Sequence, residues 1–155
     1  MNEALVYQAH YTKSDPILNY MTGMLDLRPH DSILEPCGGD GVFVDKILEK
    51  VPNANISVFE LNPHAVIGLK NKYNGEANIQ IKETDTLLDD SITSCSVKYD
   101  KIIGNPPYGA RNNEKKKDLL NKLYADLYTK ESYTLFLYAC TRCLNENGEL
   151  SFIIP

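Results

Sequence analysis

The sequence predicts an α/β fold with a doubly wound, mostly parallel β-sheet, and three observations lead to this prediction. Short apolar segments typical of strands alternate with helical patterns along most of the 155 residues. A glycine-rich turn at residues 36–41 joins the first strand to the next helix, as in nucleotide-binding folds of this class. Acidic or carboxamide residues stand where the strands end, and parallel sheets bind ligands beyond those ends.

Length and composition bound the class of protein. The chain has room for one domain, and its net charge of −5 argues against a globally basic nucleic-acid binder, although one basic face suffices for phosphate contacts. The longest apolar run, residues 135–140, is too short to cross a bilayer, so we expect no membrane partner. The cysteine spacing predicts no disulfide framework, which favours a cytoplasmic protein with reduced thiols. Cys140-x-x-Cys143 has no second pair at zinc spacing, so we expect it to pack in a helix, and we expect no metal.

The first predicted elements are a helix, a strand and a second helix. Asp15 followed by Pro16 is a favourable pair for the N-cap and N1 positions of a helix, and we expect that helix to end near Arg28-Pro29. Residues 32–35 form the first strand, and residues 42–51 have the apolar spacing of a helix. Strand, glycine turn and helix together make the arrangement that cradles nucleotides in doubly wound folds.

The middle of the chain repeats the pattern. The strand at residues 56–61 contains Glu60 near its end, and Asn62-Pro63 caps a helix that Asn74-Gly75 closes. The strand at residues 78–82 is followed by Asp85. The expected buried faces of the first and third helices are Ile17, Leu18, Met21 and Leu25, and Val66, Ile67, Leu69 and Tyr73.

The last third contains two more predicted strands. Residues 99–103 form the fourth strand, and residues 110–130 are polar. This polar stretch is either a solvated loop and helix face or a mobile segment over the site that meets phosphates. A helix at residues 132–144, ended by Asn147-Gly148, leads to the fifth strand at residues 149–154.

The fourth strand runs into Asn105-Pro106-Pro107-Tyr108. Two prolines in succession have no amide hydrogens and fixed φ angles, so the strand must end in a rigid turn. This turn has a carboxamide at its start and an aromatic ring at its end, which suits a planar polar substrate. Glu60 could accept from both hydroxyls of an unphosphorylated ribose, and Asp85 from the exocyclic amine of adenine.

The order of these motifs resembles that of the class I S-adenosylmethionine-dependent methyltransferases, and more closely the gamma group of DNA amino-methyltransferases from restriction-modification systems. The resemblance is carried by Tyr11-Thr12, residues 35–41, Asn105-Pro106-Pro107-Tyr108-Gly109, residues 133–136 and residues 148–155. It covers nearly the whole chain and implies a Rossmann-like methyltransferase fold with strand order 3-2-1-4-5. It also implies transfer of a methyl group from S-adenosylmethionine to the N6 amine of a flipped-out adenine in DNA.

The resemblance also implies roles for individual residues. The implied cofactor-binding set is Tyr11, Thr12, Glu35, Pro36, Cys37, Gly38, Gly39, Gly41, Glu60, Leu61, Asp85, Thr86 and Asn105. Glu35 and the glycines would hold the methionine moiety, Glu60 the ribose and Asp85 the adenine. Thr86 is smaller than the residue common at this place, and Cys37 is expected to pack rather than to act as a nucleophile.

The implied catalytic set is Asn105, Pro106, Pro107 and Tyr108. The Asn105 side-chain oxygen and the Pro106 carbonyl would accept the hydrogens of the amine and localise its lone pair, while Tyr108 stacks on the base. Direct in-line transfer requires no metal and no covalent intermediate. An RNA adenine, a glutamine side chain of a protein, or cytosine N4 remain alternative acceptors, and so does a non-catalytic cofactor-binding module.

The family's sheet has two further strands, and a target-recognition domain normally follows them. We therefore expect residues 1–155 to be one cofactor-binding catalytic domain that is incomplete at its C-terminal end, with residues 1–30 as a cofactor-contacting segment and helix. We expect this chain alone to be inactive or weakly active. DNA would be bound through the missing region and through Arg111, Lys115, Lys116 and Lys117. The open edge at residues 149–154 would favour self-association or a partner subunit.

Overall fold

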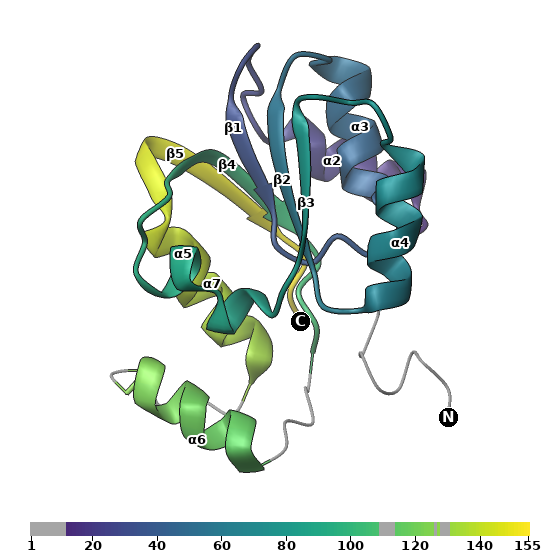
Figure 1. The fold of residues 1–155 in the computed structure, drawn as a ribbon. Helices are drawn as coiled ribbons and strands as arrows, with labels where there is room; N and C mark the ends of the chain where they lie inside the picture. Colours follow the sequence, from purple (N-terminus) through teal and green to yellow (C-terminus); the bar gives the residue numbers. More distant parts are fainter. Residues whose placement is uncertain (1–11, 109–113, 126, 128–130) are drawn as a thin grey trace.

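The computed structural model describes residues 12–108, 114–125, 127 and 131–155 (Figure 1). These residues form one sheet of five strands in the order β3-β2-β1-β4-β5, and all four pairings are parallel. The strands are β1 (Ser32–Glu35), β2 (Asn55–Glu60), β3 (Ile79–Glu83), β4 (Tyr99–Gly104) and β5 (Leu144–Phe152). The predicted fold class and strand order are therefore confirmed.

Helices cover both faces of the sheet (Figure 1). One face carries α2 (Asp15–Gly23), α3 (Val42–Lys50) and α4 (Pro63–Lys72). The other carries the short helices η1 (Thr86–Leu88) and α5 (Asp90–Thr93), followed by α6 (Glu114–Leu123) and α7 (Ser132–Arg142). In the part of the chain that the structure describes, no helix is both long and apolar enough to cross a membrane.

Each face of the sheet has its own hydrophobic core. Neighbours in the central strands contribute to different cores: Ile33 packs with α2, α3 and α4, whereas Leu34 packs with α5 and α7. Ile103 and Ile102 divide in the same way, because successive side chains of a strand point to opposite faces. Strands buried on both faces need continuous apolar runs, which explains the composition of β1 and β4.

Two helix boundaries and two expected core residues differ from the sequence prediction. Helix α2 has Ser14 rather than Asp15 at its N-cap position and ends at Gly23, well before Arg28-Pro29. Ile17 and Ile67 are 46% and 57% exposed, since they lie outside the stripe that faces the sheet. The Asn62 cap of α4 is confirmed, because its side chain accepts a hydrogen bond from the backbone N–H of His64.

The end of the chain shows the largest difference. Helix α7 ends at Arg142, and Leu144 already pairs with Tyr99 of β4. Asn147 therefore does not end the helix: it lies in an irregular stretch of β5, with a φ of 60°, a left-handed conformation that asparagine tolerates. Regular pairing resumes at Glu149, which is also ion-paired with Lys101 at 2.8 Å.

Candidate active site

The predicted site residues lie along the carboxyl edge of the sheet. Glu35 and Glu60 are the last residues of β1 and β2, which are neighbours in the sheet. Asp85 follows β3, and Asn105 follows β4 directly. Parallel strands bring their carboxyl ends to one edge, so polar groups that are far apart in the sequence meet here.

The glycine turn is hydrogen-bonded to the end of β2. The backbone N–H of Gly38 donates to the carbonyl of Phe59 at 2.9 Å, and that of Gly39 donates to Glu60 Oε2 at 2.7 Å. Gly38 is required for packing, since a Cβ there would lie 2.3 Å from Val58 Cγ1. Gly41 has a φ of 79° and caps α3. The turn is thus held rigidly with its backbone close to the neighbouring strand.

Glu60 and Glu35 are both carboxylates at strand ends, but their surroundings differ. Glu60 accepts backbone N–H groups with both oxygens, from Gly39 and from Asn62, each at 2.7 Å. A carboxylate has about four lone-pair sites, so Glu60 can accept further donors such as ribose hydroxyls. Glu35 is 1% exposed, and its Oε2 has no hydrogen-bond partner among the described residues. Burial, and then the charge of Glu60, raise the pKa of Glu35 well above its ordinary value.

Asp85 and Thr86 form the next part of the edge. Asp85 caps the short helix η1 by accepting the N–H of Leu87, and its Oδ2 pairs with Lys116 Nζ at 2.5 Å. Thr86 is buried, and its hydroxyl donates to the Pro36 carbonyl at 2.5 Å. Thr86 therefore holds the start of the glycine turn.

The Asn-Pro-Pro-Tyr turn is held by side chains from distant parts of the chain. The Asn105 amide donates to the Thr12 hydroxyl at 3.1 Å, and Ser132 Oγ donates to the Pro107 carbonyl at 2.5 Å. The Tyr108 hydroxyl lies within hydrogen-bond distance of both Asn105 Oδ1 and the Ile153 carbonyl. Burial raises the pKa of Tyr108, so its hydroxyl stays a donor. The expected acceptor oxygen of Asn105 is consequently engaged by Tyr108 in this state.

Tyr108 also has an aromatic neighbour. Its ring and that of Tyr133 at the start of α7 lie edge to face, with centroids 6.3 Å apart. Such a pair limits the rotation of both rings, because each occupies part of the other's free volume. Tyr133 was identified in the sequence only as part of a family segment, so its position against Tyr108 is new.

The remaining site predictions fall into two groups. Tyr11, Gly109 and Arg111 lie outside the described residues. Leu61 is 44% exposed beside Glu60. Burial raises the pKa of the Cys37 thiol, and a thiol that keeps its proton favours a packing role for Cys37 over a nucleophilic one. Lys115 and Lys117 lie on α6, where Lys117 pairs with Glu114.

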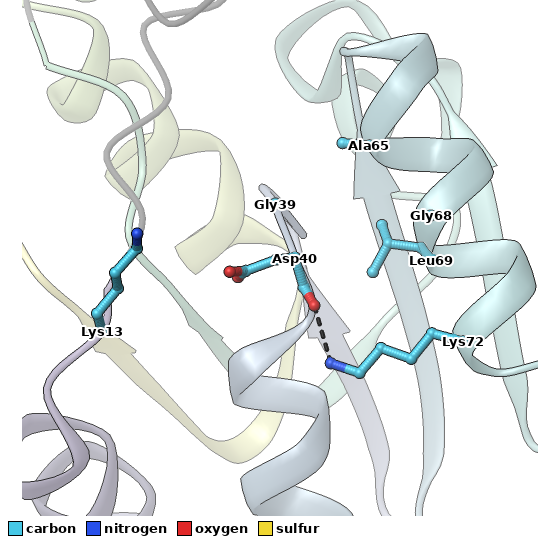
Figure 2. Close-up of a pocket in the computed structure, with 7 residues that line it drawn as sticks. All are labelled: Lys13, Gly39, Asp40, Ala65, Gly68, Leu69 and Lys72. Carbon is cyan, nitrogen blue, oxygen red and sulfur yellow. Dashed lines mark hydrogen bonds between the residues drawn. The ribbon is translucent and has the colours of Figure 1, made fainter.

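A pocket of about 430 Å³ adjoins the glycine turn (Figure 2). Its lining comprises Lys13, Gly39, Asp40, Ala65, Gly68, Leu69 and Lys72. Figure 2 shows the Asp40 carboxylate pointing toward the side of the pocket on which Lys13 lies, while Lys72 Nζ donates to the Asp40 carbonyl at 2.9 Å. Only Gly39 belongs to the predicted set. Asp40 lies within the glycine segment 35–41, and Lys13 directly follows Thr12, so both are neighbours of predicted residues.

The cysteines and metal-ligating residues form no further site among the described residues. No group of three or more His, Cys, Asp or Glu side chains there could hold a metal ion. Cys140 and Cys143 are fully buried on the α7 face of the sheet, and burial raises the pKa of Cys143 to about 12. The Cys143 sulfur lies 3.6 Å from that of Cys95.

This sheet, with a glycine turn after β1, acids at the ends of β1 and β2, and Asn-Pro-Pro-Tyr after β4, has the Rossmann-like fold of the class of methyltransferases. Within that class, residues 43–155 match the Eco57I restriction-modification methylase family, and the chain belongs to that family.

Individual relatives agree with this assignment. The chain is 38% identical over 129 residues to the modification methylase CviBIII of Paramecium bursaria Chlorella virus NC1A, covering 82% of this chain and 31% of that protein. It is 33% identical over 129 residues to the type II methyltransferase M.AccI of Acinetobacter calcoaceticus, covering 80% and 23%. This chain thus spans about a quarter to a third of the length of these relatives.

A solved structure shares the fold. The methyltransferase subunit of a type I restriction-modification system from Streptococcus thermophilus superimposes with a TM-score of 0.75 at 17% identity. The superposition covers 94% of this chain and 34% of that one. The expected methyltransferase fold is therefore confirmed.

Proposed function

We propose that this chain is the cofactor-binding and catalytic part of a DNA methyltransferase that transfers a methyl group from S-adenosylmethionine to the N6 amine of adenine. Membership of a restriction-modification methylase family supports methyl transfer to DNA. The observation that carries the acceptor assignment is the Asn105 carboxamide, held between Thr12 and Tyr108 at the end of β4. A fixed carboxamide at this edge suits an exocyclic amine.

The residues at the edge fit the cofactor. Glu60 and Asp85 are acceptors at adjacent strand ends for ribose hydroxyls and for an adenine amine, and Thr12 reaches the same edge. The buried Glu35 Oε2 lacks a partner in the described residues, so a bound ligand could supply the donor that the protein does not. When bound, S-adenosylmethionine would supply an electrophilic methyl group on a sulfonium.

The protein's part in the transfer is orientation and hydrogen bonding. An aryl amine is a weak nucleophile because its lone pair is delocalised into the ring. Asn105 Oδ1 and the Pro106 carbonyl would accept the two amine hydrogens and localise that pair. Because Pro106 and Pro107 have fixed φ angles, the carbonyl is preorganised, and each such bond contributes on the order of 1–3 kcal/mol.

Access to Asn105 requires a rearrangement of Tyr108. Its hydroxyl now bonds to the oxygen that the target amine needs, and the Ile153 carbonyl offers it a second acceptor at 2.9 Å. Moving the hydroxyl fully onto the Ile153 carbonyl would break its bond to Asn105 Oδ1. The ring of Tyr108 would then stack on a flipped base, a contact worth roughly 1–3 kcal/mol.

DNA and partner contacts are proposed for the surface around this edge. Lys115 and Lys117 lie on α6, which follows the turn in the chain, and would meet phosphates together with Arg111. The outer edge of β5 pairs with no other strand among the described residues, so it offers backbone groups to a further strand or to another subunit. A type I methyltransferase subunit among the structural neighbours supports a role within an assembly.

The proposal is tested with labelled S-adenosylmethionine and three acceptors: duplex DNA, RNA and a glutamine-containing protein. We expect label in DNA alone, at the low level of a weakly active chain, recovered as N6-methyladenine after digestion to nucleosides. Asn105→Ala should abolish transfer while calorimetry still detects cofactor binding, whereas Asn71→Ala, on the exposed side of α4, should change neither. Label in RNA, in protein or in N4-methylcytosine would contradict the acceptor assignment, and a folded chain without cofactor binding would contradict the whole proposal.

A further inference from the structure

The buried carboxyl group of Glu35 is the least satisfied polar group in the described structure. It ends β1, is 1% exposed, and its Oε2 is the one buried side-chain oxygen or nitrogen among the described residues that has no hydrogen-bond partner. Its neighbour Glu60, at the end of the adjacent strand, has both oxygens bonded to backbone N–H groups. A buried polar group without a hydrogen-bond partner destabilises the fold, so we expect a ligand to supply the donor that Glu35 lacks.

The charges around Glu35 are mostly negative. Glu60 of β2, Asp40 of the glycine turn and Asp45 of α3 all disfavour a second negative charge at this place. The cation nearby is Lys72 of α4, but its ammonium is already 2.5 Å from Asp45 Oδ2 and bonded to the Asp40 carbonyl. Burial and these acids raise the pKa of Glu35, so the free protein keeps a proton on it where an exposed glutamate has lost its own.

The partner that suits Glu35 is a compact cation with several donors. The proposed cofactor carries two positive groups, the α-ammonium of its amino acid end and the sulfonium. The ammonium has three N–H donors, whereas the sulfonium has none, so only the ammonium can satisfy a bare carboxylate oxygen. Glu35 directly precedes the glycine turn, and the pocket beside that turn is lined by Lys13 and Asp40, so groups of both charges are present where a zwitterionic end group would bind.

We propose that Glu35 loses its proton when the α-ammonium of the cofactor binds to it, so that cofactor binding releases one proton to the solvent. This inference rests on the proposed function. In the step, the O–H bond of the neutral carboxyl group breaks, its proton goes to water, and the resulting carboxylate pairs with the ammonium, which keeps all its hydrogens. No other bond is made or broken.

The linkage gives the cofactor affinity a defined pH dependence. Where free Glu35 is protonated and the bound form is not, affinity rises by about tenfold per pH unit. The rise stops once the pH exceeds the pKa of Glu35 in the free protein. Affinity falls again where the α-amino group of the cofactor loses its own proton, near pH ~8.

Titration calorimetry in buffers with different ionisation enthalpies measures the released proton directly. Between the pKa values of Glu35 in the bound and the free protein, we expect S-adenosylmethionine and S-adenosylhomocysteine to release nearly one proton each, because both carry the ammonium. 5′-Methylthioadenosine lacks the amino acid end and should bind without release. Equal release by all three ligands, or binding of the first two without release, would overturn the inference while leaving the proposed function standing. Absence of binding by the folded chain would instead contradict the proposed function.

A variant and a spectroscopic measurement complete the test. Glu35→Gln keeps the size of the side chain and cannot release the proton, so its cofactor affinity should lose the pH dependence. Glu76→Gln, which removes an exposed carboxyl group outside the site, should behave as wild type. The infrared band of a protonated carboxyl group should be present in the free wild-type chain, absent from Glu35→Gln, and lost when cofactor is added. Unchanged release in Glu35→Gln, or no such band in the free protein, would overturn the assignment.

Discussion

Lys116 Nζ of α6 lies 2.5 Å from Oδ2 of Asp85, beyond the end of β3. A basic residue of the segment expected to meet DNA is therefore paired with the acid expected to meet the adenine of the cofactor. The two side chains are 24% and 15% exposed, so the pair is only partly screened by solvent. This contact joins the surface proposed for DNA to the site proposed for the cofactor.

Replacing Lys116 by methionine should free Asp85 for the cofactor. Because Lys116 occupies one oxygen of Asp85, we expect Lys116→Met to tighten cofactor binding about twofold to fivefold, the value of a modest ion pair, and to reduce its salt dependence. Lys117→Met is the matched control, since Lys117 pairs with Glu114 on the same helix. Calorimetry at two salt concentrations measures both effects. Weaker binding in Lys116→Met would show that the pair supports the pocket instead.

The ring and the hydroxyl of Tyr108 should have different effects on methyl transfer. Tyr108→Phe keeps the ring and removes the hydroxyl from Asn105 Oδ1, so we expect transfer to be retained. Tyr108→Ala removes the stacking surface and should cost roughly 1–3 kcal/mol in kcat/KM. Both are measured with labelled cofactor on DNA. If Tyr108→Phe were as impaired as Tyr108→Ala, the hydroxyl rather than the ring would be the functional part.

The free energy of unfolding should depend on pH because of Glu35. Its pKa is raised in the folded state, so above the ordinary glutamate range the folded chain holds more protons than the unfolded chain. The free energy of unfolding therefore falls as the pH rises toward the folded-state pKa. Glu35→Gln should remove this decline and be more stable than wild type at neutral and alkaline pH. Denaturant titrations across the pH range test this, with Glu76→Gln expected to retain the wild-type decline.

Asp89 should show the opposite pH dependence. Burial would raise its pKa, but hydrogen bonds from Lys82, Ser91 and Thr84 outweigh burial and lower it. Its contribution to stability is present above the unfolded-state pKa and is lost as the pH falls through the folded-state value. Asp89→Ala should cost about 2–3 kcal/mol at neutral pH, because it removes the cap of α5 and these bonds. The difference from wild type should shrink in acid, and a constant difference would contradict this account.

Two glycines of the same region should respond in opposite directions to alanine. A Cβ at Gly38 would lie 2.3 Å from Val58 Cγ1, so Gly38→Ala should destabilise the fold by about 1–3 kcal/mol. Gly68 lies within α4, and a methyl group added there would project into open space, so Gly68→Ala should stabilise by about 0.5–1 kcal/mol. Thermal or denaturant unfolding distinguishes them. Equal effects would mean that the glycine turn can shift away from β2.

Local sequence signals were sufficient for much of the fold. Strand β1 and the Asn62 cap followed from apolar runs and capping chemistry, which depend on neighbours in the chain. The end of α7 and the irregular stretch at Asn147 could not be predicted this way, because Leu144 leaves the helix to pair with Tyr99 of another strand. Tertiary pairing overrides helical propensity at such a place.

The candidate site also has a part that local sequence signals predict and a part that depends on tertiary contacts. The acids at the strand ends and the Asn-Pro-Pro-Tyr turn were identified from position and motif. The pairing of Lys116 with Asp85, and the second acceptor that Ile153 gives Tyr108, join residues from separate elements. Neither contact has a periodic or local signature in the sequence.

The hydrogen bond from Asn105 to Thr12 has a consequence for the order of assembly. It joins residues 93 positions apart. During synthesis on the ribosome, β1, β2 and β3 can therefore begin to pair long before the carboxamide has its partner. Thr12→Val should leave the sheet intact and remove one of the bonds that orient the Asn105 amide, so the orientation of this side chain is completed only when both ends of the chain have come together.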